Sequence, residues 1–144
     1  MTNTILSLPP VSEMMRESGL EPKKRFGQNF LFDLNLTGRI ARSVPGIADS
    51  VIIEVGPGPG GLTRALLTAG ARQIIAIEKD KTTAPILSQI VNASDDRLEI
   101  IYGDALKTDL SNIDKNGFAV CSNLPYNVKG WNNQLIKTIP VATL

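Results

Sequence analysis

The sequence predicts an α/β domain built on a parallel sheet. Four short apolar runs alternate with segments of helical pattern, and each run is typical of a buried strand. The predicted strands are 51–55, 74–77, 98–102 and 118–122, and the predicted crossover helices are about 61–69 and 83–93. Alternating strands and helices imply right-handed crossovers. A chain of 144 residues with 42% apolar content is long enough for one such domain.

Two short helices are predicted ahead of the sheet. Residues 1–11 are expected to form a loose arm, after which Ser12 begins a short helix that ends at Gly19. Asp33 is expected to cap a second helix that runs to about Ser43. This helix carries one apolar stripe at i, i+4 and i+8, formed by Leu36, Ile40 and Val44.

A glycine-rich loop, residues 54–63, joins the first strand to the first crossover helix. Glycines let the backbone approach a ligand, and the helix start offers unpaired N–H groups. The GxGxxG pattern at 56–61, with Glu78 further on, is typical of dinucleotide binding. The ExGxGxG pattern that starts at Glu54 is equally typical of S-adenosylmethionine enzymes. A glycine turn without any ligand is the third interpretation.

Unusual residues follow each of the four predicted strands. They are Gly56, Glu78, Asp104 and Asn123. Taken singly, each has an ordinary interpretation: Gly56 as a turn glycine, Glu78 as a surface acid, Asp104 as part of a turn and Asn123 as part of a loop. Because the carboxyl ends of parallel strands meet at one edge of a sheet, their coincidence there predicts a ligand site.

Charge and composition restrict the partners. Net charge is +1, so nucleic-acid binding must come from a local patch. Lys23, Lys24 and Arg25 precede two phenylalanines, which suits phosphate attraction with stacking, although a solvated charge cluster is the ordinary alternative. The chain has no histidine, so neither the usual general base nor a histidine metal site is expected.

The remaining composition favours a cytoplasmic protein. We find no apolar run of about 18 residues and no signal peptide, so no membrane association is expected. Cys121 is the single cysteine and lies in an apolar run, so it is interpreted as a small buried hydrophobic residue.

Several motifs together resemble the ribosomal RNA adenine dimethyltransferases, especially their small-subunit branch. The resemblance is carried by residues 28–31, 54–63, Glu78, 103–106 and the Asn-Leu-Pro-Tyr-Asn-Val segment 123–128. It implies a Rossmann-like class I S-adenosylmethionine methyltransferase fold with sheet order 3-2-1-4. A dehydrogenase has no reason to carry the Asn-Leu-Pro-Tyr segment after its fourth strand.

The resemblance also implies residue roles. The residues implied to bind S-adenosylmethionine are Asn29, Leu31, Gly56, Glu78, Asp104 and Asn123. Glu78 would accept from two ribose hydroxyls, and Asp104 from the adenine amine of the cofactor. The catalytic residues would be Asn123, Leu124, Pro125 and Tyr126. The side-chain oxygen of Asn123 and a backbone carbonyl near Leu124 or Pro125 would hold the target amine, and the tyrosine would stack on the flipped base. Lys23, Lys24 and Arg25 would bind RNA.

The implied activity is dimethylation of adenine amines in small-subunit ribosomal RNA, within the immature 30S subunit, by a monomer that needs no metal. We expect residues 1–22 to form an arm and short helix, 23–128 an incomplete methyltransferase domain, and 129–144 a non-family tail with at most a short turn at 134–139. The later strands and a helical domain are expected to be missing, which leaves strand four as an open edge. Alternatives are an inactive remnant, an RNA-binding assembly factor and, more remotely, an NAD-dependent dehydrogenase fragment.

Overall fold

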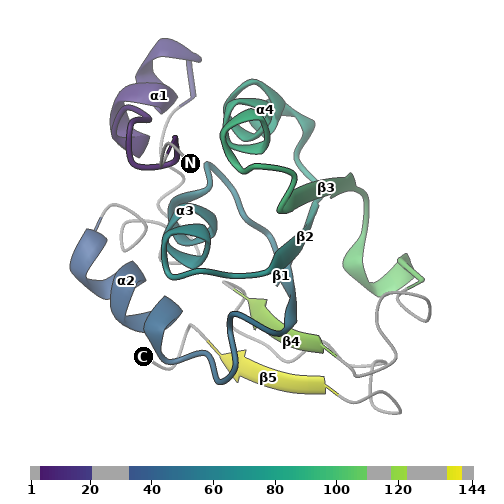
Figure 1. Cartoon of the computed structure of the whole chain (residues 1–144). Helices are drawn as coiled ribbons and strands as arrows, with labels where there is room; N and C mark the ends of the chain where they lie inside the picture. The colour runs from purple at the N-terminus through teal and green to yellow at the C-terminus, as the bar shows by residue number, and fades with distance from the viewer. Residues whose placement is uncertain (1–3, 21–32, 110–117, 123–135, 141–144) are drawn as a thin grey trace.

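The computed structural model describes residues 4–20, 33–109, 118–122 and 136–140. Within these ranges, five strands form one parallel sheet in the order β3-β2-β1-β4-β5 (Figure 1). The strands are β1 Val51–Val55, β2 Gln73–Glu78, β3 Leu98–Tyr102, β4 Phe118–Ser122 and β5 Ile136–Pro140. The predicted α/β class and the order 3-2-1-4 are therefore confirmed, and the sheet continues by one further strand.

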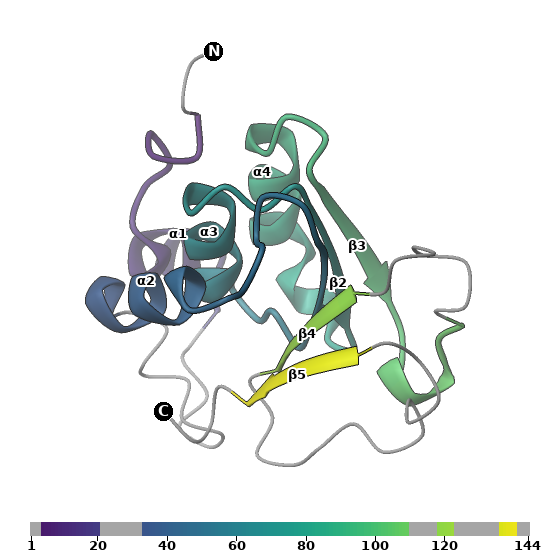
Figure 2. The same cartoon turned by 60° about the horizontal axis from the view of Figure 1, so that its bottom comes forward.

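The fifth strand corrects the expectation that strand four is an open edge. β5 pairs in parallel with β4, from Phe118 opposite Ile136 to Ser122 opposite Pro140, and Figure 2 shows it running alongside β4. A strand therefore stands where a short turn was expected. Three of its five residues are β-branched, which favours a strand, and the edge of β4 supplies the backbone partners that a strand needs.

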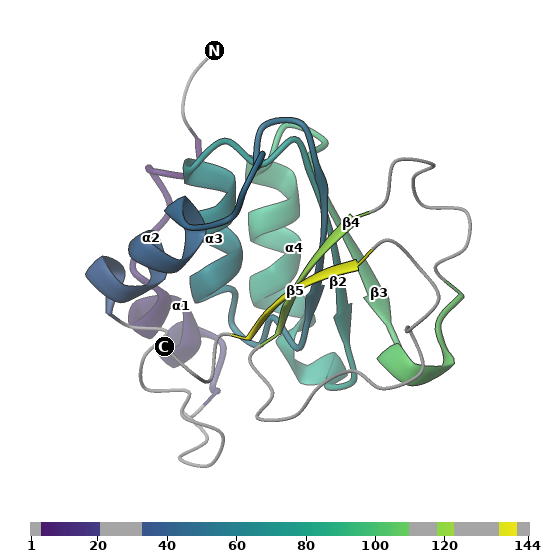
Figure 3. The same cartoon turned by 90° about the horizontal axis from the view of Figure 1, so that it is seen from below.

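Four helices of the described chain lie on the same side of the sheet, as Figure 3 shows. They are α1 Val11–Glu17, α2 Leu34–Arg42, α3 Gly61–Thr68 and α4 Ala84–Ala93, with short 3-10 helices η2 Lys81–Thr83 and η3 Ala105–Lys107. Asp33 caps α2 as predicted, since its Oδ1 accepts hydrogen bonds from the backbone N–H groups of Asn35 and Leu36. In the described ranges, no helix is long and apolar enough to cross a bilayer.

The core lies on both faces of the sheet. Side chains alternate along each strand, so Ile52 and Ile74 pack toward the helices while Ile53 and Ile75 form a second cluster on the opposite face. Burial of both faces is the usual state of a parallel sheet and explains the nearly continuous apolar strands. Cys121 belongs to the helix-side cluster and is fully buried, as predicted.

Residues 4–11 are not a loose arm. Ile5 is only 2% exposed and belongs to the core, and the Thr4 hydroxyl donates to the carbonyl of Ala93 at 2.7 Å. The guanidinium of Arg64 donates to the carbonyls of Pro9 at 2.6 Å and Leu8 at 3.2 Å. These bonds hold the segment against α3 and α4, so the amino end contributes to the packed helical layer.

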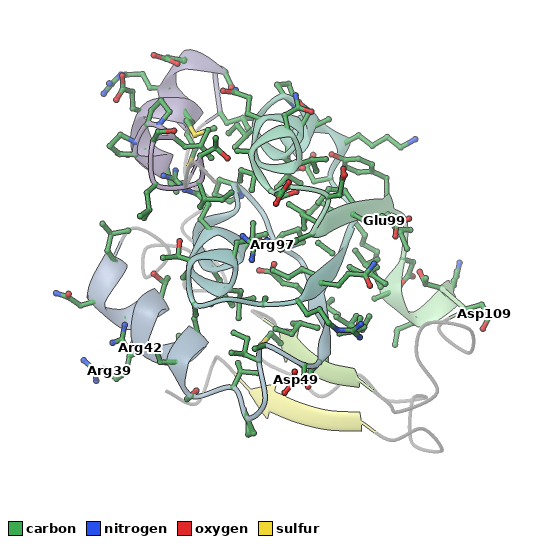
Figure 4. The ribbon with its side chains drawn as sticks, viewed as in Figure 1. Arg39, Arg42, Asp49, Arg97, Glu99 and Asp109 are labelled. Carbon is green, nitrogen blue, oxygen red and sulfur yellow. The ribbon has the colours of Figure 1, made fainter. Side chains whose placement is uncertain are left out.

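Arg97 connects the carboxyl ends of α3 and α4. Its Nη1 donates to the carbonyls of Leu67 at 3.1 Å and Ala71 at 2.9 Å, and its Nε donates to the carbonyl of Ser94 at 3.2 Å. Figure 4 shows it beside α3, whereas Arg39 projects from α2. The carbonyls of Leu67 and Ser94 also accept backbone N–H groups, from Gly70 and from Arg97 itself, so Arg97 adds a side-chain link between segments that are already locally bonded.

Candidate ligand site at the carboxyl edge of the sheet

The register of the sheet brings three predicted site positions to one edge. Val55 lies opposite Ile77 and Ser122, and Glu78 lies opposite Tyr102, so the strands end almost level. The backbone ladder continues past the strand ends. Gly56 donates to the carbonyl of Ile77, and Gly103 donates to the carbonyl of Glu78, both at 2.9 Å. Gly56, Glu78 and Asp104 therefore lie on the same rim.

Two glycines of the loop after β1 serve different purposes. Gly56 has φ +71°, and a Cβ built there would meet no atom of the described residues within 4 Å, so those residues leave the space above it open. Gly60 has φ +90°, and its Cβ would lie 2.3 Å from Cδ1 of Ile90. A left-handed conformation favours glycine at both positions. Gly60 also permits close packing on α4, whereas Gly56 leaves room for a ligand.

Glu78 joins the glycine loop to the end of β2. The residue is 7% exposed; Oε2 of its carboxylate accepts a hydrogen bond from the backbone N–H of Gly58 at 3.1 Å, and Oε1 accepts one from that of Asp80 at 3.3 Å. A carboxylate has about four acceptor positions and can accept several hydrogen bonds at once. The side chain is thus held in place at the rim of the sheet.

Asp104 is more open than Glu78. Its Oδ1 accepts the backbone N–H of Leu106 at 2.9 Å at the start of η3, and its Oδ2 lies 3.8 Å from Nζ of Lys79. The lysine side chain is 74% exposed, so this ion pair contributes little to stability. A Cβ on Gly103 would meet nothing within 4 Å, and its φ is not left-handed. Neither packing nor backbone conformation requires glycine there, which is consistent with a ligand close to the backbone.

Glu54 and Thr63 form a buried pair that sequence reasoning missed. Oε1 of Glu54 accepts the Thr63 hydroxyl at 2.5 Å, and Glu54 is 2% exposed. Burial raises the pKa of Glu54 to about 7; the Thr63 hydrogen bond lowers it, and the negative charge of Glu78 raises it further. The sequence did carry one signal for this pair: an acid inside an otherwise apolar strand is buried and therefore needs a polar partner. The bond fixes the first turn of α3 on β1.

Several predicted site residues lie outside the described residues, and their roles stay predictions. They are Lys23, Lys24, Arg25, Asn29, Leu31, Asn123, Leu124, Pro125 and Tyr126. Asn123 follows Ser122, the last residue of β4, directly in the chain. In the part of the chain that the structure describes, no group of three or more Cys, Asp or Glu side chains is arranged to hold a metal ion.

Comparison with known proteins identifies the family. The family model described as ribosomal RNA adenine dimethylase matches residues 19–139. The match includes residues 129–139, which we expected to be non-family tail. It supports the methyltransferase interpretation of the glycine loop over the dehydrogenase one.

Individual relatives agree with the family match. Ribosomal RNA small subunit methyltransferase A of Rhizobium johnstonii is 51% identical over 122 residues, which cover 84% of this chain and 44% of that protein. The protein of the same name from Rhodospirillum rubrum is 53% identical over 121 residues, covering 84% and 42%. The crystal structure of the 23S rRNA methyltransferase ErmE superposes with a TM-score of 0.54 at 29% identity, covering 65% of this chain and 36% of that one.

The chain spans less than half the length of these curated relatives. The shared part contains the glycine loop, β1 to β4 and the acids at their ends. With a family match over most of its length and about half of its aligned residues identical to these relatives, the chain belongs to the ribosomal RNA adenine dimethylase family.

Proposed function

We propose that the chain is the cofactor-binding region of an S-adenosylmethionine-dependent ribosomal RNA adenine-N6,N6-dimethyltransferase. The observation that carries this proposal is the Glu78 carboxylate, buried at the sheet edge and held by Gly58 beside the open space at Gly56. The names of the relatives, small subunit methyltransferases, support the same class of reaction.

The described residues suit the parts of S-adenosylmethionine. A ribose offers two adjacent hydroxyl donors, and a carboxylate such as that of Glu78 can accept two hydroxyl hydrogen bonds at once. An adenine amine can donate a hydrogen bond to the partly exposed carboxylate of Asp104. Gly56 lets the backbone approach without a side chain in the way. When bound, the cofactor supplies an electrophilic methyl group on a positively charged sulfur.

The methyl acceptor is proposed to be held by Asn123, Leu124, Pro125 and Tyr126. The side-chain oxygen of Asn123 and a backbone carbonyl of Leu124 or Pro125 would accept the two N–H groups of an adenine amine. Tyr126 would stack on the flipped base. The chain contains no histidine. Because the methyl group on the positively charged sulfur is already electrophilic, positioning of the amine supplies most of the catalysis. The amine loses its proton after methylation, so no general base is needed before the attack.

The proposed partner is small-subunit ribosomal RNA in the immature 30S particle, bound by a monomer in the cytoplasm. Lys23, Lys24 and Arg25 would contact the phosphate backbone, where each neutralised phosphate adds to the salt dependence of binding. Changing all three to alanine is expected to weaken RNA binding and to reduce its slope against salt concentration. Cofactor affinity should stay the same.

Calorimetry tests the cofactor. The chain is expected to bind S-adenosylmethionine and to show no heat of binding with NADH. Binding of NADH alone would overturn the proposal and favour the dehydrogenase alternative.

Transfer of labelled methyl groups to undermethylated 30S subunits separates an enzyme from an inactive remnant or an assembly factor. Asn123→Ala is expected to abolish transfer and to spare RNA binding. The matched control, Asn92→Ala, changes an exposed residue of α4 and should transfer normally. Full transfer by Asn123→Ala would contradict its assigned role.

A further inference from the structure

Glu54 is a buried carboxyl group to which the proposed chemistry gives no task. In the described residues, no basic side chain compensates its charge. On α3, the Thr63 hydroxyl donates to it, and the guanidinium of the next residue, Arg64, instead donates to the carbonyls of Pro9 and Leu8. The packing around Glu54 therefore places an acid close to the glycine loop with the Thr63 hydroxyl as its hydrogen-bond partner.

The neighbouring strands add no positive charge either. Glu78 on β2 contributes a negative charge that raises the pKa of Glu54. Cys121 on β4 lies directly across the ladder from Glu54, and burial raises the pKa of its thiol to about 12, so it stays neutral near pH 7. α4 faces the loop with the apolar side chains of Leu87 and Ile90. The surroundings thus favour the arrival of a cation.

We propose that Glu54 is a charge-selecting positioning residue: a ligand with a positively charged sulfonium at the glycine loop binds with release of a proton from Glu54. This inference rests on the proposed function and deepens it. S-adenosylmethionine carries a sulfonium charge that its product, S-adenosylhomocysteine, lacks. Because opposite charges attract more strongly in a buried site than in water, ionised Glu54 favours the methyl donor over the spent product.

The linkage has a definite sign. With a pKa of about 7, Glu54 is about one tenth ionised at pH 6 and about nine tenths ionised at pH 8. If the ionised form is the one that selects the cation, the affinity ratio of donor to product rises about tenfold between these pH values. Glu54→Gln keeps the size of the side chain but cannot ionise, so its ratio should stay flat. Any titration of the ligand itself affects the wild type and Glu54→Gln alike, so it cancels when the two proteins are compared.

Thr63 provides a second test, because its hydrogen bond lowers the pKa of Glu54. Thr63→Val removes the hydroxyl and should move the midpoint of the pH profile upward, whereas Thr63→Ser keeps the hydroxyl and should restore the original midpoint. A purely structural role would not produce this shift and rescue. Thr82→Val, an exposed threonine on η2, is the matched control and should leave the profile unchanged.

The experiment is isothermal titration calorimetry of the 144-residue chain with both ligands between pH 6 and 8. We expect a rising donor-to-product ratio in the wild type and a flat one in Glu54→Gln. A flat wild-type ratio with both ligands bound would overturn this inference and leave the proposed function intact. Absence of S-adenosylmethionine binding would overturn both.

A wild-type measurement keeps the inference testable if a variant does not fold. Titrations in buffers of different ionisation enthalpy count the protons released on binding. At pH 7 the donor should release about half a proton more than the product. Equal proton counts for the two ligands would contradict the role of Glu54.

Discussion

The backbone N–H of Gly58 lies 3.1 Å from Oε2 of Glu78, and this bond joins the loop after β1 to the last residue of β2. A hydrogen bond to a carboxylate is charge-assisted and stronger than one between neutral groups. Glu78 therefore fixes the glycine loop through the same side chain that is proposed to hold the ribose. The loop is arranged for the ligand by the strand next to it.

The affinity for S-adenosylmethionine should depend strongly on Glu78. Glu78→Gln keeps one acceptor oxygen but replaces the other with an amide donor and removes the negative charge, so the hydrogen bonds to the loop and to the ribose cannot all be kept. Hydrogen bonds to charged groups contribute about 1.5–3 kcal/mol, and we expect affinity to fall by about tenfold or more. Calorimetry measures the change. Glu99→Gln, at an exposed position on β3, is the control and should bind like the wild type; equal affinity in both variants would contradict the prediction.

Gly60 should tolerate no side chain. Gly60→Ala places a Cβ 2.3 Å from Cδ1 of Ile90 and keeps a left-handed φ of +90°. Backbone strain of about 1–2 kcal/mol and overpacking of about 1–3 kcal/mol should lower the free energy of unfolding together. Gly70→Ala, at φ +99° with nothing within 4 Å, has the strain alone. Urea unfolding should show the larger loss for Gly60→Ala, and equal losses would argue against the clash.

The amino-terminal segment should contribute to global stability. Ile5 is 2% exposed while its neighbour Leu6 is 64% exposed, so the two adjacent positions differ mainly in burial. Ile5→Ala is expected to cost about 2–5 kcal/mol through lost packing and a residual cavity. Leu6→Ala should change stability by less than about 0.5 kcal/mol. Thermal and urea unfolding measure both, and a negligible effect of Ile5→Ala would restore the idea of a loose arm.

Stability should decrease with pH through Glu54. Its pKa rises on folding from an ordinary 4.5 to about 7. The folded state then binds the proton more tightly than the unfolded state, so the stabilisation is present below about pH 4.5 and is lost as pH rises to about 7. The total loss is about 3 kcal/mol. Urea unfolding from pH 5 to 8 should show wild type losing stability relative to Glu54→Gln; parallel profiles would contradict it.

The elements that local pattern specifies were predictable. β1, β3 and β4 have the predicted bounds because short, mainly apolar runs between turn residues leave few alternatives. Asp33 caps α2 through contacts with residues two and three positions ahead, which are local and therefore visible in the sequence. The placement of Gly56, Glu78 and Asp104 on one rim followed from the rule that parallel strands end together.

Contacts between distant segments were not predictable. Ile5 is buried because it packs into the core and its neighbour Thr4 bonds to Ala93, a residue 89 positions away. β5 exists because the edge of β4 offers partners, and its short sequence carries only a weak preference. The Glu54–Thr63 pair depends on how α3 packs against β1. In each case tertiary context decides the outcome, and periodicity alone does not reveal it.

The burial of Cys121 makes the local opening of β4 observable. It is the only thiol of the chain, lies fully inside the core on β4 and stays protonated near neutral pH. Thiolate-directed reagents can reach it only after β4 separates from its surroundings. The labelling rate therefore records how often that region opens, with no introduced probe. A bound cofactor that tightens the sheet edge should slow the labelling in proportion to its occupancy.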